Sequence, residues 1–342
     1  WKANEVIGND IWCIYEDWEG DIWLGLSNGI ARMAFSSPIS RYDSEDLIGV
    51  LAATLHKDKL YFATLDGVYQ ASYSNGIIGD LNSIDSLEEQ GWKFYVHEDD
   101  LLCAHAKGIY KIEKDNSVVK ISSAYTWTII PVPNHPNILL AGTYNKGLLV
   151  LEKSKDGVWE EKKYLEGFQE SARYVVAEKE KGVFWVSHAY KGVFKIKIND
   201  SFTEILSVET FGVQNGLPSN TYNFVFASKG KTIFGTEEGF YVYDSTANKF
   251  ETHNSLNRVF NNPKKVKKFM QDLQGNLWTF TQNGAMLAKK SIDGFKLVSK
   301  GFPQLYRENI YSINPLDSST VFLGTPSECV KFDLNANLNQ VL

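Results

Sequence analysis

The chain has 342 residues, of which 43% are hydrophobic and 13% aromatic, and its formal net charge is −6. A chain of this size buries a large core, but 30 lysines and only five arginines in an acidic chain do not provide the basic face of a nucleic-acid-binding protein. No apolar run approaches the roughly 18 residues of a membrane-spanning helix, so we expect no direct membrane insertion.

The cysteines Cys13, Cys103 and Cys329 lie far apart in the sequence and form no CxxC pair. This spacing fits neither a disulfide framework nor a zinc site, so we expect three buried free thiols. The six histidines lack metal-ligand spacing, and the chain has no GxSxG, HExxH or phosphate-loop motif. The sequence therefore predicts no catalytic residue, no metal and no cofactor.

From its first residues to its last, the chain repeats an apolar run, a short polar turn that usually ends in glycine, and a second run of alternating polarity. Alternation with a period of two is typical of a half-buried strand, and two such runs joined by a short turn predict a β-hairpin. The expected hairpins are 22–33, 60–71, 101–112, 138–151, 183–196, 232–243, 277–288 and 321–332.

Each hairpin follows another extended run, and most precede a less regular strand such as VWEEKKYLEGF at 158–168. The only helical turn that we expect is SIDSLEEQG at 83–91. Four antiparallel strands every ~40–50 residues are typical of a β-propeller blade, and blades in a ring bury both faces of each sheet. The sequence therefore predicts an all-β chain, a β-propeller of four-stranded antiparallel blades. The side chains expected to fill the space between blades are Trp23, Phe62, Trp185, Phe234 and Trp278.

Two repeats share the spacing D-x-x-G-x-x-W, at 17–23 and 272–278. An Asp side chain accepts backbone N–H groups in a tight turn, and glycine adopts a positive φ there without strain. These segments resemble the Asp-box turns of sialidase-type propellers, where the turns are structural, so we assign them a structural role.

The repeats also resemble the two-component regulator propeller repeats of bacterial sensor proteins, whose pattern is roughly I-x-x-I-x-x-D-x-x-G-x-I-W-I-G-T-x-x-G-I. The matching segments are 11–30, 168–196, 216–244 and 266–284, and the similarity covers nearly the whole chain, more weakly at 72–100 and in the last repeat. This resemblance implies a periplasmic sensor domain, the extracytoplasmic part of a membrane-anchored protein. In such proteins the propellers precede an immunoglobulin-like module, a membrane helix and a kinase or DNA-binding output. We therefore expect residues 1–342 to be a single propeller domain within a larger protein.

Propellers of this family usually have seven blades, whereas the chain has eight repeats. We expect eight blades, closed by an outer strand from the segment before Asp10, with a seven-bladed ring as the alternative in which one repeat belongs to a neighbouring propeller.

In an up-and-down blade, the turns between second and third strands and the links between blades lie on one face of the ring. Loops on a rigid scaffold often carry binding, and Tyr, His and Asn suit a polar ligand such as a sugar. The candidate ligand-binding residues on that face are Tyr144, Asn145, Glu170, Arg173, His188, Tyr190, Asn220 and Tyr222. The alternative is that these are solvated turn residues, with a local ion pair between Glu170 and Arg173.

The leading hypothesis is a non-catalytic sensor that binds an oligosaccharide or another small polar ligand and contacts a neighbouring propeller and immunoglobulin-like module. One alternative is a scaffold or dimerisation propeller that forms a homodimer and binds no ligand directly. Another is a polysaccharide lyase or hydrolase, since an acidic chain contains many carboxylate pairs.

Overall fold

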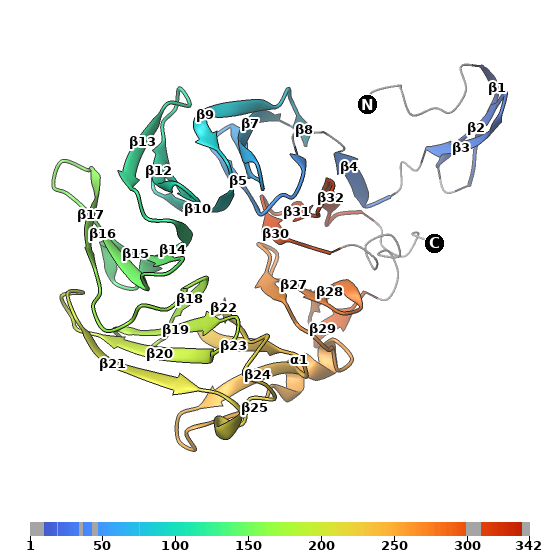
Figure 1. The fold of residues 1–342 in the computed structure, drawn as a ribbon. Coiled ribbons are helices and arrows are strands. Elements are labelled where there is room, and N and C mark those ends of the chain that lie inside the picture. The colour runs from blue at the N-terminus through green and yellow to red at the C-terminus, as the bar shows by residue number, and fades with distance from the viewer. Residues whose placement is uncertain are drawn as a thin grey trace.

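The computed structural model describes residues 10–18, 20–33, 37–42, 47–74, 76–298 and 309–336. Apart from one short helix, α1 (Asn254–Val259), and a 3₁₀ turn at Val213–Asn215, its regular structure consists of strands. In this part of the chain, seven antiparallel sheets surround a central opening as the blades of a propeller (Figure 1).

The blades follow one another in chain order. Blade one contains β5 (Ala52–His56), β6 (Lys59–Ala63), β7 (Gly67–Ser74), β8 (Ile77–Ile78) and β9 (Asn82–Glu88). Blade two contains β10 (Gly91–His97), β11 (Asp100–His105), β12 (Gly108–Ile112) and β13 (Val118–Ser122). Blade three contains β14 (Thr126–Val132), β15 (His135–Thr143), β16 (Leu148–Lys153) and β17 (Trp159–Tyr164). Blade four contains β18 (Tyr174–Ala177), β19 (Val183–His188), β20 (Gly192–Ile198) and β21 (Ile205–Phe211).

The last three blades complete the ring. Blade five contains β22 (Phe224–Ser228), β23 (Lys231–Thr236), β24 (Gly239–Asp244) and β25 (Lys249–Thr252). Blade six contains β26 (Lys268–Gln271), β27 (Leu277–Thr281), β28 (Gly284–Ser291) and β29 (Gly294–Leu297). Blade seven contains β30 (Ser312–Pro315), β31 (Thr320–Gly324), β32 (Cys329–Asp333) and, from the other end of the chain, β4 (Ile39–Tyr42).

The core is divided into seven apolar clusters, each of which joins two neighbouring blades. The cluster between blades seven and one, which includes Phe62, Phe322 and Cys329, closes the circle. Four of the five predicted filler residues lie in these clusters, because Phe62, Trp185, Phe234 and Trp278 are fully buried. Packing between blades therefore stabilises the ring, as the repeat pattern predicts.

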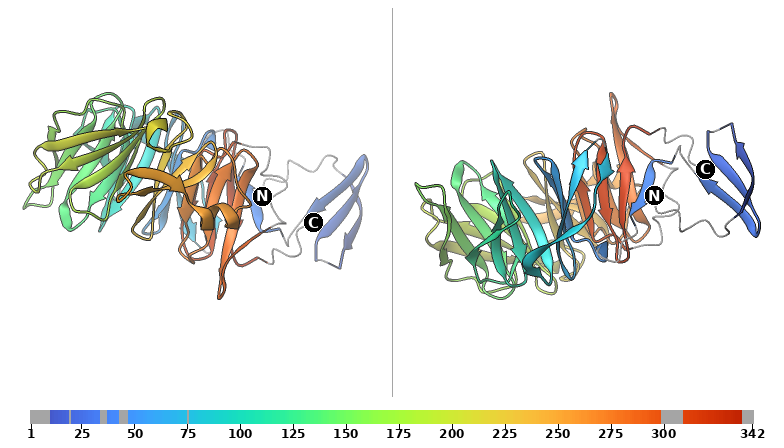
Figure 2. Two further views of the ribbon diagram at one scale, coloured as in Figure 1. Left: turned by 90° about the horizontal axis from the view of Figure 1, so that it is seen from below. Right: turned by 90° about the horizontal axis from the view of Figure 1, so that it is seen from above.

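The first repeat lies outside the ring. The strands β1 (Ile11–Glu16), β2 (Ile22–Leu26) and β3 (Gly29–Met33) pair only with one another among the described residues, and Figures 1 and 2 show this sheet beyond the edge of the ring. All eight predicted hairpins are confirmed, but the expected eight-bladed ring is wrong and the seven-bladed alternative is correct.

The closing strand also differs from the expectation. Strand β4 pairs antiparallel with β32, with Ile39 opposite Phe332 and Tyr42 opposite Cys329. The ring is therefore closed by a segment after the first repeat, whereas the segment before Asp10 lies outside the described residues. The expected helical turn at 83–91 is also wrong, because Asn82–Glu88 forms β9 and pairs with β7.

Both D-x-x-G-x-x-W segments form the predicted turn. Asp272 accepts hydrogen bonds from the backbone N–H of Asn276 at 2.8 Å and from the indole Nε1 of Trp278 at 2.9 Å, and Gly275 has φ 86°. Asp17 bonds the backbone of Asp21 and the indole of Trp23 in the same way. The turn is structural in both places.

The separate sheet also explains a wrong prediction about the cysteines. Cys103 and Cys329 are buried free thiols as expected, and burial raises the pKa of each far above its ordinary value. Cys13 is exposed, because strand β1 has no neighbouring blade to cover it.

Candidate functional site

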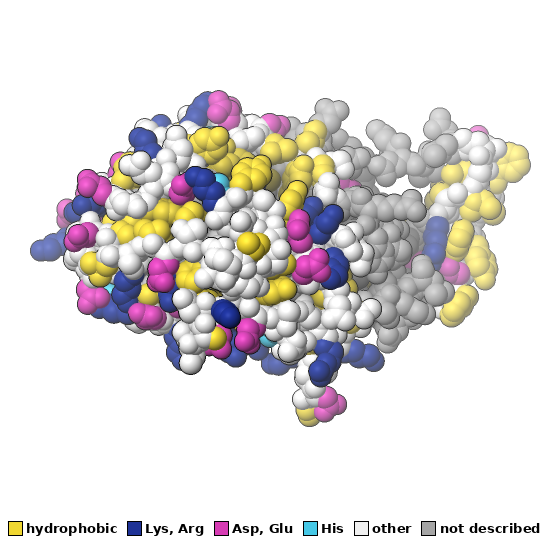
Figure 3. Space-filling model, turned by 60° about the horizontal axis from the view of Figure 1, so that its bottom comes forward, with side chains coloured by type: hydrophobic (Ala, Val, Ile, Leu, Met, Phe, Trp, Pro, Cys, Tyr) yellow, Lys and Arg dark blue, Asp and Glu magenta, His cyan; other side chains and the backbone are white. Residues whose placement is uncertain are grey.

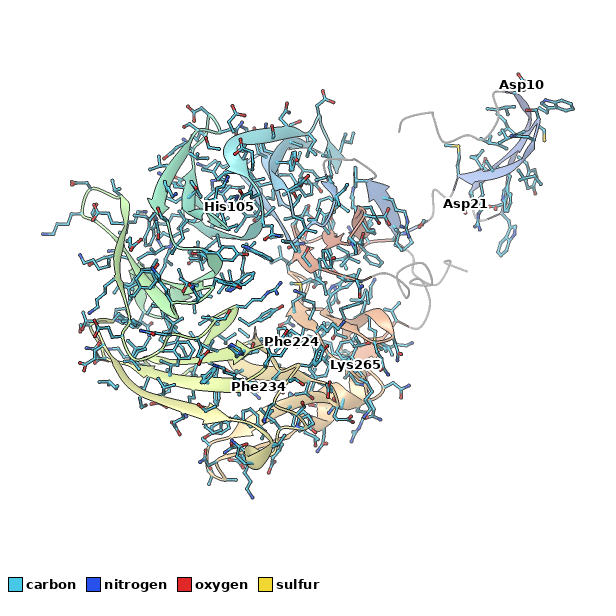
Figure 4. The ribbon with its side chains drawn as sticks, viewed as in Figure 1. Asp10, Asp21, His105, Phe224, Phe234 and Lys265 are labelled. Carbon is cyan, nitrogen blue, oxygen red and sulfur yellow. The ribbon has the colours of Figure 1, made fainter. Side chains whose placement is uncertain are left out.

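A cavity of about 540 Å³ lies at the centre of the ring and is lined by the inner strands of all seven blades. Figure 4 shows side chains of the inner strands extending into this central opening, with Phe224 near its edge. A volume of this size falls in the range of roughly 300–1,000 Å³ that is typical of ligand pockets. The channel is therefore large enough to hold a small ligand.

The two ends of the channel differ in chemistry. Farther along the inner strands, its lining is apolar or uncharged, as at Pro131, Ala177 and Met270. Near the starts of the strands, it carries aromatic and cationic side chains. These are Trp92, Lys93, Trp127, Arg173, Tyr174 and Lys268. The polar end lies on the same face as the turns between second and third strands, because strand direction alternates within each blade.

Aromatic rings from blades two and three form one cluster at this polar mouth. The centroid of Trp127 lies 4.4 Å from that of Trp92, 5.1 Å from that of Tyr125 and 5.6 Å from that of Tyr144. The guanidinium carbon of Arg173 lies 4.8 Å from the Trp127 ring and 5.1 Å from the Trp92 ring, a cation–π arrangement. Flat apolar faces beside hydrogen-bonding groups suit the two-sided surface of a sugar ring.

Two lysines and a tyrosine extend the site into the channel. The Nζ of Lys268 lies 5.5 Å from the Tyr174 ring, and the Nζ of Lys93 donates to the hydroxyl of Thr128 at 3.3 Å. Burial would raise the pKa of Tyr174, but the positive charges of Lys268, Arg173 and Lys93 together hold this pKa below its ordinary value. Loss of hydration, followed by repulsion from Lys268, lowers the pKa of Lys93. The mouth therefore brings together the cationic side chains of Lys93, Arg173 and Lys268.

We expect Lys93→Met to stabilise the folded protein at neutral pH. The fold disfavours the charged form of Lys93, so its charge destabilises the ring at pH values below its lowered pKa, and that penalty disappears as the pH rises toward 10.5. Methionine keeps the length of the side chain and removes the charge. The midpoint temperature of thermal unfolding should rise by about 1 °C or less at neutral pH, because Lys93 is exposed to the water of the channel, which screens the charge. The gain should shrink in alkaline buffer. Lys155→Met, in the exposed turn between β16 and β17, makes the same charge change and should leave the midpoint unchanged; a lower midpoint for Lys93→Met would contradict the prediction.

Two of the sequence-predicted residues belong to this mouth. Tyr144, in the turn between β15 and β16, is half exposed and contacts Tyr125 and Trp127. Arg173, in the link before β18, lies over the two tryptophans. The predicted ion pair between Arg173 and Glu170 is wrong, because Glu170 instead contacts Lys191, whose Nζ lies 2.7 Å from its Oε1.

Glu170 belongs to a second group of predicted residues on blade four. The Nε2 of His188 lies 3.7 Å from the Oε2 of Glu170, and the Nδ1 of His188 accepts the backbone N–H of Tyr190 at 3.1 Å. Burial lowers the pKa of His188, and Lys191 acts in the same direction while Glu170 opposes it. At neutral pH this group is a polar surface of modest charge.

The other three predicted residues lie apart from the mouth. Asn145 lines a smaller hollow of about 370 Å³ between blades two and three. The side-chain oxygen of Asn220 accepts the backbone N–H of Val213 at 3.0 Å, and its carbonyl accepts that of Gly192 at 2.8 Å, so Asn220 has a structural role. Tyr222 is half exposed and has φ 56°.

The mouth also contains five residues that were not among the predicted site residues: Trp92, Lys93, Trp127, Tyr174 and Lys268. A signal was present, because each lies at or near the start of an extended run that precedes a predicted hairpin. Inner strands of a propeller face its axis, so polar and aromatic residues at their starts converge. Among the described residues, no group of three or more His, Cys, Asp or Glu is arranged to hold a metal ion, and none of the described helices meets the length and hydropathy of a membrane span.

No protein-family model and no curated protein sequence matches the chain. Solved structures do match. The extracellular domain of the putative hybrid two component system BT4673 from B. thetaiotaomicron has a TM-score of 0.68 at 16% identity, over 98% of this chain and 48% of that one. The corresponding domain of BT3049 from the same organism has a TM-score of 0.69 at 18% identity, over 96% and 46%. This chain thus spans about half the length of those domains.

The same fold occurs in an enzyme. Virginiamycin B lyase from Staphylococcus aureus has a TM-score of 0.59 at 11% identity, over 86% of this chain and 99% of the lyase. At such identities the likeness shows a shared fold. The similarity to two-component regulators that the repeats indicate is confirmed at the level of the fold.

Proposed function

Because the ring has the fold of the extracellular domains of two-component regulators, we propose that this chain is a non-catalytic sensing module of such a regulator. Its place is the periplasm, as part of a membrane-anchored protein, and its ligand is a carbohydrate or a similarly polar molecule. Its role is to bind that ligand and pass the change in blade or domain packing to an output module.

The polar mouth of the channel is the observation that carries this proposal. Trp92, Trp127, Tyr125 and Tyr144 offer aromatic faces, and Arg173 and Lys93 offer hydrogen-bond donors, around a cavity of ligand size. Aromatic faces beside hydrogen-bond donors are suited to carbohydrates. The apolar face of a sugar ring stacks on an aromatic side chain, and the sugar hydroxyl groups form hydrogen bonds with polar side chains. No described carboxylate lines the mouth, whereas glycoside cleavage needs a pair. Binding without turnover therefore fits the described mouth better than a lyase or hydrolase.

Calorimetric titration of the chain with a panel of oligosaccharides tests the proposal. At least one member should bind, Trp127→Ala should weaken that binding by about tenfold or more, and the oligosaccharide should be recovered unchanged after incubation. Val119→Ala replaces an exposed apolar side chain on the outer strand β13 and serves as the control. Absence of binding, in this chain and in the full extracellular protein, would refute direct sensing, and cleaved products would favour an enzyme.

The proposal includes a neighbouring propeller and an immunoglobulin-like module of the same protein. The exposed side chains of the sheet β1–β3 support a contact with the neighbouring propeller. Every residue of β1 is exposed. A strand this rich in apolar side chains normally packs at least one of its two faces against another part of the protein. The large apolar side chains exposed on this sheet and its first turn are Ile11, Trp12, Ile14, Tyr15, Trp18 and Ile30. Figure 3 shows hydrophobic side chains over this sheet, apart from the ring. An apolar strand that is exposed on both sides fits a blade whose neighbour lies in another part of the protein.

We expect Cys13 to report this contact. In the present chain the Cys13 thiol is exposed and should react with iodoacetamide under native conditions, while buried Cys103 and Cys329 stay unmodified as internal controls. In a longer protein that contains the preceding segment, alkylation of Cys13 should slow by about tenfold or more, because the neighbouring blade covers β1. Equal rates in the two proteins would contradict the contact.

The same exposed sheet favours the scaffold hypothesis as a second candidate, in which two copies of the chain cover each other's β1–β3. Sedimentation separates the two candidates. A dimer in the full extracellular protein, with protection of Cys13 that rises with protein concentration, would support the scaffold function, whereas a monomer with constant protection would support the neighbouring propeller.

A further inference from the structure

Among the described residues, the cationic side chains at the channel mouth have no acidic partners. Lys93, Arg173 and Lys268 come from three different blades, and no described carboxylate lies within ion-pair distance of any of them. No described Asp or Glu lines the cavity. The whole chain has six more acidic than basic residues. A group of unpaired positive side chains at one end of the channel is therefore not expected from the composition of the chain.

Positive charges elsewhere in the described part of the chain are commonly neutralised. Lys111 and Lys153 both contact Asp100, at 3.1 and 2.9 Å, and Lys191 contacts Glu170. The repulsion between Lys93 and Lys268 also lowers the pKa of Lys93. The fold therefore keeps three cationic side chains together with no described acidic partner, which is typical of a binding site whose counter-charge arrives with the ligand.

The arrangement gives the mouth two zones. Lys93, Lys268 and the hydroxyl of Tyr174 form a cationic zone within the channel, and Trp127 and Tyr144 form an aromatic zone at its rim, with Arg173 between them. A planar guanidinium suits carboxylate and sulfate groups, because it donates two parallel hydrogen bonds to their oxygens.

We propose that the channel mouth binds an acidic oligosaccharide, with its carboxylate or sulfate group held by Lys93, Lys268 and Arg173 and an adjacent sugar ring against Trp127 and Tyr144. This inference rests on the proposed sensing function and names the class of ligand. Carboxylate and sulfate share the chemistry that the site recognises, so the experiment must compare them.

The test is calorimetry with four probes: a uronic-acid trisaccharide, the neutral trisaccharide in which CH₂OH replaces each carboxylate, a sulfated trisaccharide and sodium sulfate. One of the two acidic sugars should bind at least about tenfold more tightly than the neutral sugar, and the better of the two identifies the anionic group. Its affinity should fall between about 50 mM and about 500 mM sodium chloride, because salt screens the attraction.

Charge-removing variants locate the site. Lys93→Met and Lys268→Met should each weaken binding of the acidic sugar by about tenfold and leave the weak binding of the neutral sugar unchanged. Lys155→Met, with the same charge change in a turn on the opposite face, should have no effect. Circular dichroism and the thermal midpoint of each variant show that the ring is still folded.

The possible failures are distinguishable. If the neutral sugar binds as tightly as the acidic ones and the lysine variants change nothing, this inference is wrong while the sensing function stands. If sodium sulfate binds as tightly as the acidic sugars, the site recognises an anion without a sugar, which also overturns the inference. If the wider oligosaccharide panel also gives no binding, the proposed function itself fails.

Discussion

Removal of residues 1–46 should open the ring, whereas removal of residues 1–34 should leave it closed. The two shortened chains differ by the segment that contains β4, the outer strand of blade seven. We expect the chain 47–342 to unfold at a much lower urea concentration than the whole chain, or to associate through its free strand edge. Equilibrium unfolding and size-exclusion chromatography measure these effects.

The physical reason is that β4, from the N-terminal part of the chain, supplies the outer strand of the last blade beside β32. It pairs with β32 at four positions from Ile39 to Tyr42, and the Tyr42 ring packs edge-on against Phe322 at 6.0 Å. Arg41 also forms an ion pair with Glu328. Losing these backbone hydrogen bonds and the burial of two apolar side chains costs about 5 kcal/mol. That is a large part of the roughly 5–15 kcal/mol that holds a typical domain folded, and the bare edge of β32 becomes a template for association.

The chain 35–342 is the matched control, since it loses the separate sheet β1–β3 and keeps β4. Its urea midpoint should equal that of the whole chain, because β1–β3 pairs with no strand of the ring in the described structure. If both shortened chains lose stability equally, the assignment of β4 as the closing strand is wrong. If neither shortened chain loses stability, blade seven is stable without β4, and the prediction is also wrong.

The hairpins were predictable because each depends on local sequence. Alternating polarity places one face of each strand in a core, and a glycine such as Gly147, with φ 69° and another backbone 2.0 Å from where a Cβ would lie, marks a turn that other residues fit poorly. Ring closure was not predictable in this way. The segments at 17–23 and 272–278 form the same turn with the same hydrogen bonds, yet one lies in a separate sheet and the other in blade six. Whether a repeat becomes a blade of the ring depends on its packing against other repeats that lie far away in the sequence. The local sequence pattern of one repeat does not contain that information.

The site was half predictable for a related reason. Turn residues such as Tyr144 stand out because they interrupt an apolar run, and the rarity of arginine drew attention to Arg173. Lys93 and Lys268 lie inside extended runs, where a lysine usually marks the solvent side of an amphipathic strand. Only the closed ring turns that side toward a shared axis and brings lysines 175 positions apart close enough for one to lower the pKa of the other.

The second large effect should come from Trp185, which fills the space between blades four and five. Its side chain is fully buried, with ring centroids of Tyr243 at 5.0 Å, Phe234 at 5.2 Å and Phe211 at 5.3 Å, and its indole N–H donates to Glu178. Trp185→Ala should lower the free energy of unfolding by about 3–5 kcal/mol, because it leaves a cavity and removes one hydrogen bond of Glu178, which still accepts from Thr232. Urea unfolding measures the change.

Trp23→Ala is the matched control, since Trp23 occupies the same position of the first repeat and packs in no interface between the described blades. It is 37% exposed, bonds Asp17 within its own turn and lies under Arg32. Its removal should change ring stability by no more than about 0.5 kcal/mol in this chain. In a longer protein where a neighbouring blade covers β1–β3, the same substitution should become costly, because the tryptophan then fills an interface as Trp185 does. An effect of Trp23→Ala that is equally small in both proteins would mean that β1–β3 has no blade beside it, and the proposed neighbouring propeller would have to be given up.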